Sequence, residues 1–119
     1  LDGDGALLVH IRILANNGAL RPRNFTHIIL NNGAHDSVGG QPTVGLKVDI
    51  LEIARAASYE RVLRAQTQHE LQSCLIDLKG SKGPSLLEIR VRCGARKDLG
   101  RPATTPAQNK SAFMDFLEG

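Results

Sequence analysis

The sequence predicts an α/β fold in which a parallel sheet is flanked by helices. Strand-like and helix-like segments alternate along the 119 residues, and this length accommodates one domain. Turns rich in glycine and asparagine follow the first predicted strands. Alternation of this kind favours parallel strands, because each parallel connection needs a crossover that a helix commonly provides. Ligands of such sheets bind beyond the carboxyl ends of the strands.

The first segments predict the tail of a strand, a helix and a second strand. Leu1 leads directly into Gly3-Asp4-Gly5, a turn typical of the carboxyl end of a strand, so we expect an N-terminally truncated sheet. Residues 6–16 are apolar on nearly every side and precede Asn17-Gly18, which predicts a buried helix that stops there. Residues 25–30 are rich in β-formers and predict a strand.

A segment rich in structure breakers follows at residues 31–47. Its breakers are Gly33, Gly39, Gly40, Pro42 and Gly45. They predict an irregular loop, and loops of this length inside a compact domain are usually functional or mobile.

The next segments continue the alternation of helix and strand. Asp49 is in position to cap a helix, and residues 59–63 predict a short strand. Thr67 and Glu70 have the spacing of a capping box, which opens a further helix that ends before Gly83-Pro84.

The last strand and the last helix are predicted near the end of the chain. Residues 85–93 alternate apolar side chains with Glu88, Arg90 and Arg92, which predicts a strand with a drier and a wetter side. We therefore expect the later half of this strand to be exposed on one face. Thr105-Pro106 starts a final helix with an apolar stripe.

The charge of the chain is moderately positive and unevenly distributed. Fifteen Lys and Arg residues against 12 Asp and Glu residues give a formal net charge of +3. A basic cluster near the end comprises Arg90, Arg92, Arg96, Lys97 and Arg101. Such a cluster fits either a solvated face or a site for a phosphate-like group. It lacks the aromatic side chains that stack on bases, so nucleic acid is the weaker interpretation.

Membrane insertion and disulfide chemistry are not indicated. No apolar run reaches the roughly 18 residues of a membrane span, and we expect a soluble, cytoplasmic protein. Cys74 and Cys93 lack the C-x-x-C spacing of a redox or zinc site, so both are expected to be reduced thiols.

Two motifs point to a metal and an anion at one sheet edge. Asn31-Asn32 begins about 25 residues after Gly3-Asp4-Gly5, and each motif directly follows a predicted strand. A carboxylate, a carboxamide and a backbone carbonyl there would supply the hard oxygen ligands that Mg²⁺ prefers. Free N–H groups at the start of the following helix would favour an anion nearby. Each motif taken singly is an ordinary turn.

Taken together, these motifs resemble the thiamine diphosphate motif of thiamine diphosphate-dependent decarboxylases. Longer blocks extend the resemblance to the phosphonopyruvate decarboxylase family over nearly the whole chain. These blocks are Leu1 to Ala6, Asn31 to Thr43, Gly94 to Pro102, Thr105-Pro106, Asn109-Lys110 and Ala112 to Met114. The fold that the resemblance implies is the thiamine diphosphate-binding fold.

The resemblance implies an enzyme that requires thiamine diphosphate and Mg²⁺ and decarboxylates 3-phosphonopyruvate to phosphonoacetaldehyde and CO₂. Asp4 and Asn32 would bind Mg²⁺ through their side chains and Ala34 through its carbonyl. Gly3 and Gly5 would let the backbone approach the diphosphate. The cofactor-binding residues that the resemblance implies are Gly3, Asp4, Gly5, Ala6, Asn32 and Ala34.

The resemblance also implies that two domains together form the cofactor site. Residues 1–119 would form the diphosphate- and Mg²⁺-binding domain at the C-terminal part of a longer enzyme, with residues 95–119 as a tail that carries the final helix. A pyrimidine-binding domain on the same or a partner chain would supply an activating Glu. A cofactor held between domains favours a homo-oligomer, and the isolated chain is expected to be inactive.

Further residues are candidates for substrate binding or catalysis. His35 and Asp36 stand beside the metal motif and could contact substrate or transfer a proton, since His titrates near neutral pH. Their alternative role is loop structure. Arg96, Lys97 and Arg101 could bind the phosphonate, because guanidinium pairs with such groups through parallel hydrogen bonds. Their alternative role is a solvated surface or a subunit contact.

Two departures from the family pattern bear on substrate choice. Asp36 stands where Glu is expected, and Arg12 stands where a small residue is expected in the first helix. Two other functions therefore stay open. One is a sulfopyruvate decarboxylase or another thiamine diphosphate-dependent 2-oxo acid decarboxylase, and the other is a noncatalytic cofactor-binding or subunit-interface fragment.

Overall fold

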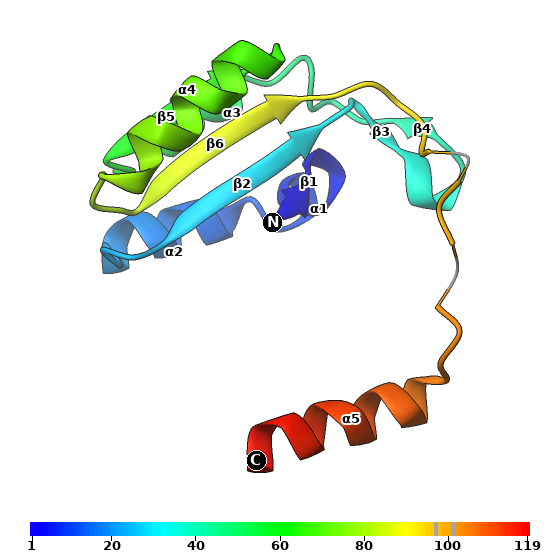
Figure 1. Ribbon diagram of the computed structural model, residues 1–119. Coiled ribbons are helices and arrows are strands. Elements are labelled where there is room, and N and C mark those ends of the chain that lie inside the picture. The colour runs from blue at the N-terminus through cyan, green and yellow to red at the C-terminus, as the bar shows by residue number, and fades with distance from the viewer. Residues whose placement is uncertain (97, 101) are drawn as a thin grey trace.

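A parallel four-stranded sheet forms the centre of the computed structural model, which describes residues 1–96, 98–100 and 102–119. Its strands lie in the order β1-β2-β6-β5 (Figure 1). The bounds are Asp2–Gly3 for β1, Thr26–Asn31 for β2, Arg61–Ala65 for β5 and Ser85–Arg90 for β6. All neighbouring pairs are parallel. The predicted α/β fold class is confirmed.

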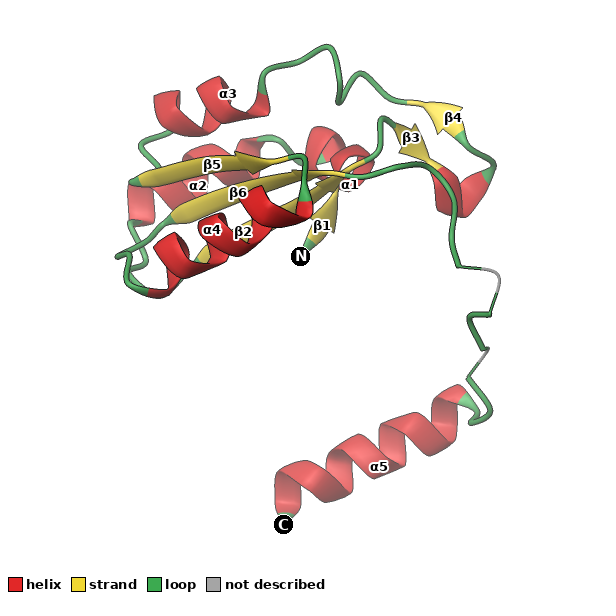
Figure 2. Cartoon of the chain, turned by 45° about the horizontal axis from the view of Figure 1, so that its top comes forward, coloured by secondary structure: helices red, strands yellow, loops and turns green. Residues whose placement is uncertain are grey.

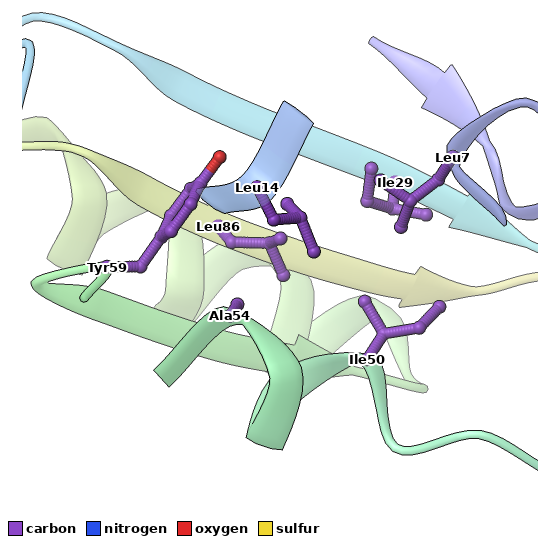
Figure 3. Packing of buried hydrophobic residues seen from close by; sticks show 7 residues of the cluster. All are labelled: Leu7, Leu14, Ile29, Ile50, Ala54, Tyr59 and Leu86. Carbon is purple, nitrogen blue, oxygen red and sulfur yellow. The ribbon is translucent and has the colours of Figure 1, made fainter. Parts of the chain in front are cut away.

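Helices cover both faces of this sheet (Figure 2). Helices α1 (Asp4–Val9), α2 (Arg12–Leu20) and α3 (Ile50–Ala56) pack on one face, and α4 (Gln68–Lys79) packs on the other. The larger core lies on the first face and is shown in Figure 3. Its buried members are Leu7, Leu14, Ile29, Ile50, Ala54, Tyr59 and Leu86. The smaller core under α4 contains Ala65, Leu78 and Leu87.

The first predicted helix is divided in two. The helical backbone begins at Asp4 rather than at Ala6 and is interrupted after Val9. At the interruption the His10 N–H donates to the carbonyls of both Ala6 and Leu7, at 3.3 and 3.1 Å. Such shared i−3 and i−4 bonds are common at helix ends. Arg12, the residue that departs from the family pattern, is exposed at the first position of α2, so its charge is not buried.

The prediction that this helix stops at Asn17-Gly18 is wrong. Helix α2 continues to Leu20, and Arg21 ends it in the left-handed conformation at a φ of 49°. Gly18 is buried, and a Cβ atom there would overlap the carbonyl oxygen of Ala57, at the end of α3. The glycine therefore permits close approach of two helices instead of terminating one of them.

The segment after β2 is more regular than the sequence predicts. Strands β3 (Ala34–His35) and β4 (Gln41–Pro42) pair in antiparallel fashion around a 3₁₀ turn at Asp36–Val38. Gly39 and Gly40 follow this turn with φ values of 117° and 75°, which glycine adopts without the cost that a Cβ would add. The breakers thus build a small hairpin (Figure 1).

The predicted caps of α3 and α4 are confirmed. The Asp49 side chain accepts hydrogen bonds from the N–H groups of Leu51 and Glu52, and the bond from Glu52 is the main reason that the pKa of Asp49 is lowered. Thr67 and Glu70 form a reciprocal capping box. Backbone N–H groups bonded to Glu70 lower the pKa of its carboxyl group.

Strand β5 begins two residues later than the sequence predicts. Ser58, at a φ of 69°, turns the chain after α3, and Tyr59 is buried in the larger core instead of joining the sheet. Burial raises the pKa of the Tyr59 hydroxyl. Core packing of one aromatic side chain thus shifts the start of the strand.

The predicted wetter side of the last strand is wrong at Glu88. Strand β6 ends at Arg90 and lies between β2 and β5, with helices over both faces. Residues Ser85 to Glu88 are all buried, and Glu88 is 0% exposed. The central position of the strand, which local alternation does not reveal, excludes solvent from this carboxylate.

Helix α5 (Pro106–Glu118) lies apart from the sheet (Figures 1 and 2). Its predicted start is confirmed, because Thr105 and Gln108 form a capping box. Its apolar side chains, Phe113, Met114, Phe116 and Leu117, are exposed. Among the described residues, no helix has both the length and the apolar character needed to cross a membrane.

We predict that Gly18→Ala lowers the free energy of unfolding by about 1–3 kcal/mol, because the added methyl group forces α2 and α3 apart. Chemical denaturation of the protein measures this loss. Gly80→Ala is the matched control, since a Cβ there meets no atom within 4 Å and should change the free energy of unfolding by less than about 0.5 kcal/mol. Equal stability of the two variants would contradict the proposed helix contact.

Candidate functional site

A cavity lies beyond the carboxyl ends of β1 and β2. Gly3 pairs with Leu30 in the parallel register, so the residues that follow both strands emerge at one edge of the sheet. The cavity has a volume of about 430 Å³. Its walls include every residue predicted to bind cofactor or to act in catalysis: Gly3, Asp4, Gly5, Ala6, Asn32, Ala34, His35 and Asp36.

Asp4 is a buried carboxylate at the wall of this cavity. It is 1% exposed and accepts a hydrogen bond from the Thr43 hydroxyl, which in turn accepts from the Gly45 N–H at 3.0 Å. Within the described residues, Asp4 forms no ion pair with Lys, Arg or His. A buried carboxylate without a cationic partner is costly, and a bound cation would relieve that cost.

The two neighbouring asparagines have different environments. Asn31 is fully buried, and its Nδ2 donates to the Gly45 carbonyl at 2.8 Å and to Glu88 Oε1 at 2.6 Å. Its Oδ1 accepts from the Gly33 N–H at 3.1 Å. Asn32 lines the cavity instead. Asn31 therefore serves the fold, and Asn32 is the asparagine that a ligand can reach.

The oxygen atoms around the cavity fit a hard divalent cation. Asn32 Oδ1 accepts one hydrogen bond, from the Ala34 N–H at 3.0 Å, and an amide oxygen has a second lone pair. The donor set of Asp4, Asn32 and the Ala34 carbonyl contains oxygen only, as Mg²⁺ prefers. A Cβ atom at Gly45 would overlap Asp4 Oδ2, so this glycine lets the segment after the hairpin lie against the carboxylate.

His35 and Asp36 lie beside these oxygen atoms. The His35 ring rests against Gly5, where a Cβ atom would overlap ring atoms Cε1 and Nδ1. Gly5 is therefore needed for the histidine, whatever its role toward a diphosphate. Asp36 Oδ2 accepts from Asn32 Nδ2 at 2.9 Å and from the Gly94 N–H at 2.7 Å. These bonds orient Asn32, whereas catalytic roles for His35 and Asp36 stay predictions.

Of the three predicted substrate-binding residues, the structure describes Arg96, and Arg96 does not line the cavity. Arg96 is exposed, and its guanidinium pairs with the Asp98 carboxylate at 3.1 Å. Lys97 and Arg101 lie outside the described residues. Arg92, which belongs to the same basic cluster, does line the cavity. Its position just after β6 is the signal that could have singled it out from the sequence.

Glu88 is a residue near the site that sequence reasoning assigned to the wrong environment. Its Oε2 accepts from Arg64 Nε at 2.5 Å, and its Oε1 accepts from Arg90 Nε at 2.9 Å as well as from Asn31. The one sequence signal is an acidic residue inside the apolar run from Leu86 to Ile89. That signal becomes informative only when β6 is known to be a central strand.

Most of the chain matches one family model. Residues 1–89 match the family model described as thiamine pyrophosphate enzyme, C-terminal TPP binding domain. The matched range includes Asp4, Asn32 and all of the four-stranded sheet except Arg90, the last residue of β6. The chain belongs to the family of thiamine pyrophosphate enzymes. Thiamine pyrophosphate and thiamine diphosphate are names for the same cofactor, so the resemblance inferred from the two motifs is confirmed.

The chain is similar in sequence to phosphonopyruvate and sulfopyruvate decarboxylases. Phosphonopyruvate decarboxylase of Streptomyces viridochromogenes is 38% identical over 117 residues, and that of Streptomyces hygroscopicus is 36% identical over 116 residues. Each alignment covers 98% of this chain, but the chain spans only 30% and 29% of the length of these relatives. Sulfopyruvate decarboxylase subunit beta of Methanococcus maripaludis is 31% identical over 99% of this chain and 63% of its own length.

We predict that Gly3→Ala weakens thiamine diphosphate binding about tenfold or more and leaves the thermal unfolding temperature unchanged. A Cβ atom at Gly3 meets no protein atom within 4 Å, yet Gly3 lines the cavity. The added methyl group would therefore clash with a bound ligand but with no part of the protein. Calorimetric titration of the cofactor measures the effect, with Gly80→Ala as the control that should bind normally. Unchanged affinity in Gly3→Ala would mean that the cofactor does not approach this backbone.

Proposed function

We propose that this chain supplies the diphosphate- and Mg²⁺-binding domain of a decarboxylase that converts 3-phosphonopyruvate to phosphonoacetaldehyde and CO₂. The observation that carries the proposal is the cavity in which buried Asp4 lies with Asn32 and Ala34 beyond the carboxyl ends of β1 and β2. Membership of the thiamine pyrophosphate enzymes and the likeness to two phosphonopyruvate decarboxylases support it.

In this proposal the chain holds Mg²⁺ and the diphosphate together. The Asp4 carboxylate, the Asn32 amide oxygen and the Ala34 carbonyl would hold Mg²⁺, which prefers oxygen ligands, and the cation would attract the anionic diphosphate. The Thr43 hydroxyl fixes Asp4, and Asp36 fixes the Asn32 amide group so that its oxygen stays available. Gly3 leaves open space beside the backbone.

The chemistry that thiamine diphosphate supplies when bound is acceptance of the electron pair left by departing CO₂. The net reaction replaces CO₂ by a proton on the substrate carbon, so the site needs a proton donor. His35 is our candidate, because its ring lies at the cavity wall against Gly5 and an imidazole can act as a general acid or base. Asp36 is a second candidate for substrate contact at the same wall.

Recognition of the substrate phosphonate is assigned to basic residues after β6. Arg92 lines the cavity, and its guanidinium can form two parallel hydrogen bonds to a phosphonate. Arg96, Lys97 and Arg101 remain proposed contributors from the adjoining segment. A sulfonate has similar geometry, so sulfopyruvate is the second candidate substrate, and the likeness to a sulfopyruvate decarboxylase subunit favours keeping it. The higher sequence identity to the phosphonopyruvate decarboxylases supports phosphonopyruvate as the first candidate substrate.

The proposal includes a partner for this domain. The chain spans 30% of the length of its Streptomyces viridochromogenes relative, and one relative is named a beta subunit. We propose that a pyrimidine-binding domain, on the same or a partner chain, completes the cofactor site and supplies the activating Glu. A homo-oligomer follows from a cofactor held between domains, with residues 95–119 as the tail of the longer enzyme.

Removal of the metal ligand should abolish tight cofactor binding. In the full-length enzyme, Asp4→Ala is expected to raise the Kd for thiamine diphosphate at fixed Mg²⁺ by at least about 100-fold, because a buried anionic ligand is lost. Asn32→Asp should cost less, about tenfold, because it keeps an oxygen but adds charge near the diphosphate. Circular dichroism checks the fold of both variants. Wild-type affinity in Asp4→Ala would remove the main support for the metal assignment.

Loss of Arg92 should discriminate between substrates. Arg92→Ala is expected to lower kcat/KM for phosphonopyruvate about 10- to 100-fold, since a charge-assisted hydrogen bond contributes about 1.5–3 kcal/mol. Turnover of pyruvate, which lacks the phosphonate, should change little. Equal losses on both substrates would show that Arg92 serves structure.

Parallel measurements resolve the remaining substrate question. Arg96→Ala and Arg101→Ala, compared on the same two substrates, test the other basic residues. Steady-state kinetics of the unmodified enzyme on phosphonopyruvate and sulfopyruvate decide between the two candidate substrates. A higher kcat/KM for sulfopyruvate would transfer the proposal to the second candidate.

A further inference from the structure

We infer that Glu88, which lies outside the cavity, positions two segments next to the proposed metal ligands, residues 33–35 and 43–48. It does so through the amide group of Asn31. This inference rests on the proposed function, because it concerns the same site. Glu88 is not among the residues that line the cavity, and it is 0% exposed. It is therefore a positioning residue rather than a catalytic one.

The position of Glu88 in the sheet gives it partners on both sides. In the parallel register it pairs with Ile29 of β2 and with Arg64 of β5. The guanidinium groups of Arg64 and Arg90 contact different oxygens of its carboxylate, at 2.5 and 2.9 Å. Two cations thus balance a carboxylate that water cannot reach. Removing one partner from such a group leaves an uncompensated charge.

The Glu88 carboxylate also selects the orientation of Asn31. An ionised carboxylate only accepts hydrogen bonds, so the Asn31 NH₂ group must face it, here at 2.6 Å. The same NH₂ group then donates to the Gly45 carbonyl, and the amide oxygen faces the Gly33 N–H. A flipped amide would place donors against the Gly33 donor and oxygen against two acceptors. Glu88 thereby determines which way this buried amide points.

Both backbone groups held by Asn31 belong to segments next to the proposed metal ligands Ala34 and Asp4. Gly33 directly precedes Ala34, the proposed carbonyl ligand. Gly45 donates through its N–H to the Thr43 hydroxyl, and this hydroxyl donates to Asp4. A continuous series of hydrogen bonds therefore links Glu88 to the proposed metal carboxylate. Loosening the first bond should loosen both segments.

Hydrogen exchange in the full-length protein tests the structural part of this inference. In Glu88→Gln, backbone amides of residues 33–35 and 43–48 should exchange at least about tenfold faster than in wild type, because the Asn31 amide loses its fixed orientation. Glu88→Asp keeps a charge between the arginines but withdraws its oxygens from Asn31. It should give the same result if Glu88→Gln does not fold. Unchanged exchange in the folded variants would overturn the inference.

Asp77→Asn is the matched control for these measurements. It also removes a carboxylate that pairs with an arginine, Arg61, but this pair is at the surface, where β5 begins and α4 ends. Exchange of residues 33–35 and 43–48 should be unchanged. Faster exchange there in Asp77→Asn would show that general loss of stability accounts for the effect, and it would overturn a specific role of Glu88.

A double-mutant cycle tests whether Glu88 acts through Asn31. Glu88→Asp and Asn31→Ala should each raise the Kd for thiamine diphosphate at fixed Mg²⁺ by about tenfold or more, and the double variant should bind no more weakly than Asn31→Ala alone. Additive losses would overturn the inference. If wild type itself fails to bind thiamine diphosphate, the proposed function fails, while hydrogen exchange still decides whether Glu88 holds the two segments.

Discussion

The buried carboxamide of Asn31 is the interaction on which the site depends. It bonds to Gly33 two residues later in the chain, to Gly45 in the segment after the hairpin, and to Glu88, 57 residues away on β6. Parallel pairing of β2 with β6 makes this possible, because it brings the last residue of one strand beside the carboxyl end of the other. The sheet therefore determines where the hairpin begins and where the following segment lies.

Two buried carboxylates near this amide are compensated in different ways. Glu88 has two guanidinium partners, so its charge is balanced within the protein. Asp4 is also buried, but it accepts a hydrogen bond from the Thr43 hydroxyl. Among the described residues, no basic side chain pairs with it. Buried charge is tolerated only when paired or bound to metal. This difference separates a carboxylate that maintains the fold from one that is available to a cation.

Glycines contribute to the same arrangement by allowing close approach. Gly18 admits α2 to the end of α3, Gly5 admits the His35 ring, and Gly45 admits the Asp4 carboxylate. Local sequence signals predicted a helix stop at Gly18, and the resemblance implied a diphosphate contact at Gly5. The contact with Ala57 explains Gly18 instead, and the contact with His35 is a further reason for glycine at Gly5, whose diphosphate contact stays a prediction.

Local signals in the sequence determined the fold class, the helix caps at Asp49, Thr67 and Thr105, and the pairing of Gly3-Asp4-Gly5 with Asn31-Asn32 at one sheet edge. These features depend on residues close together in the chain or on the order of strands and helices. The resemblance pointed to Asn32 as the asparagine at the site, and the structure places it at the cavity. Only the tertiary structure decided that Asn31 bonds to Glu88 and Gly45, that Arg92 lines the cavity, and that Glu88 is buried. Those outcomes depend on which strand is central and which segments meet across the sheet, and neither is encoded in local periodicity.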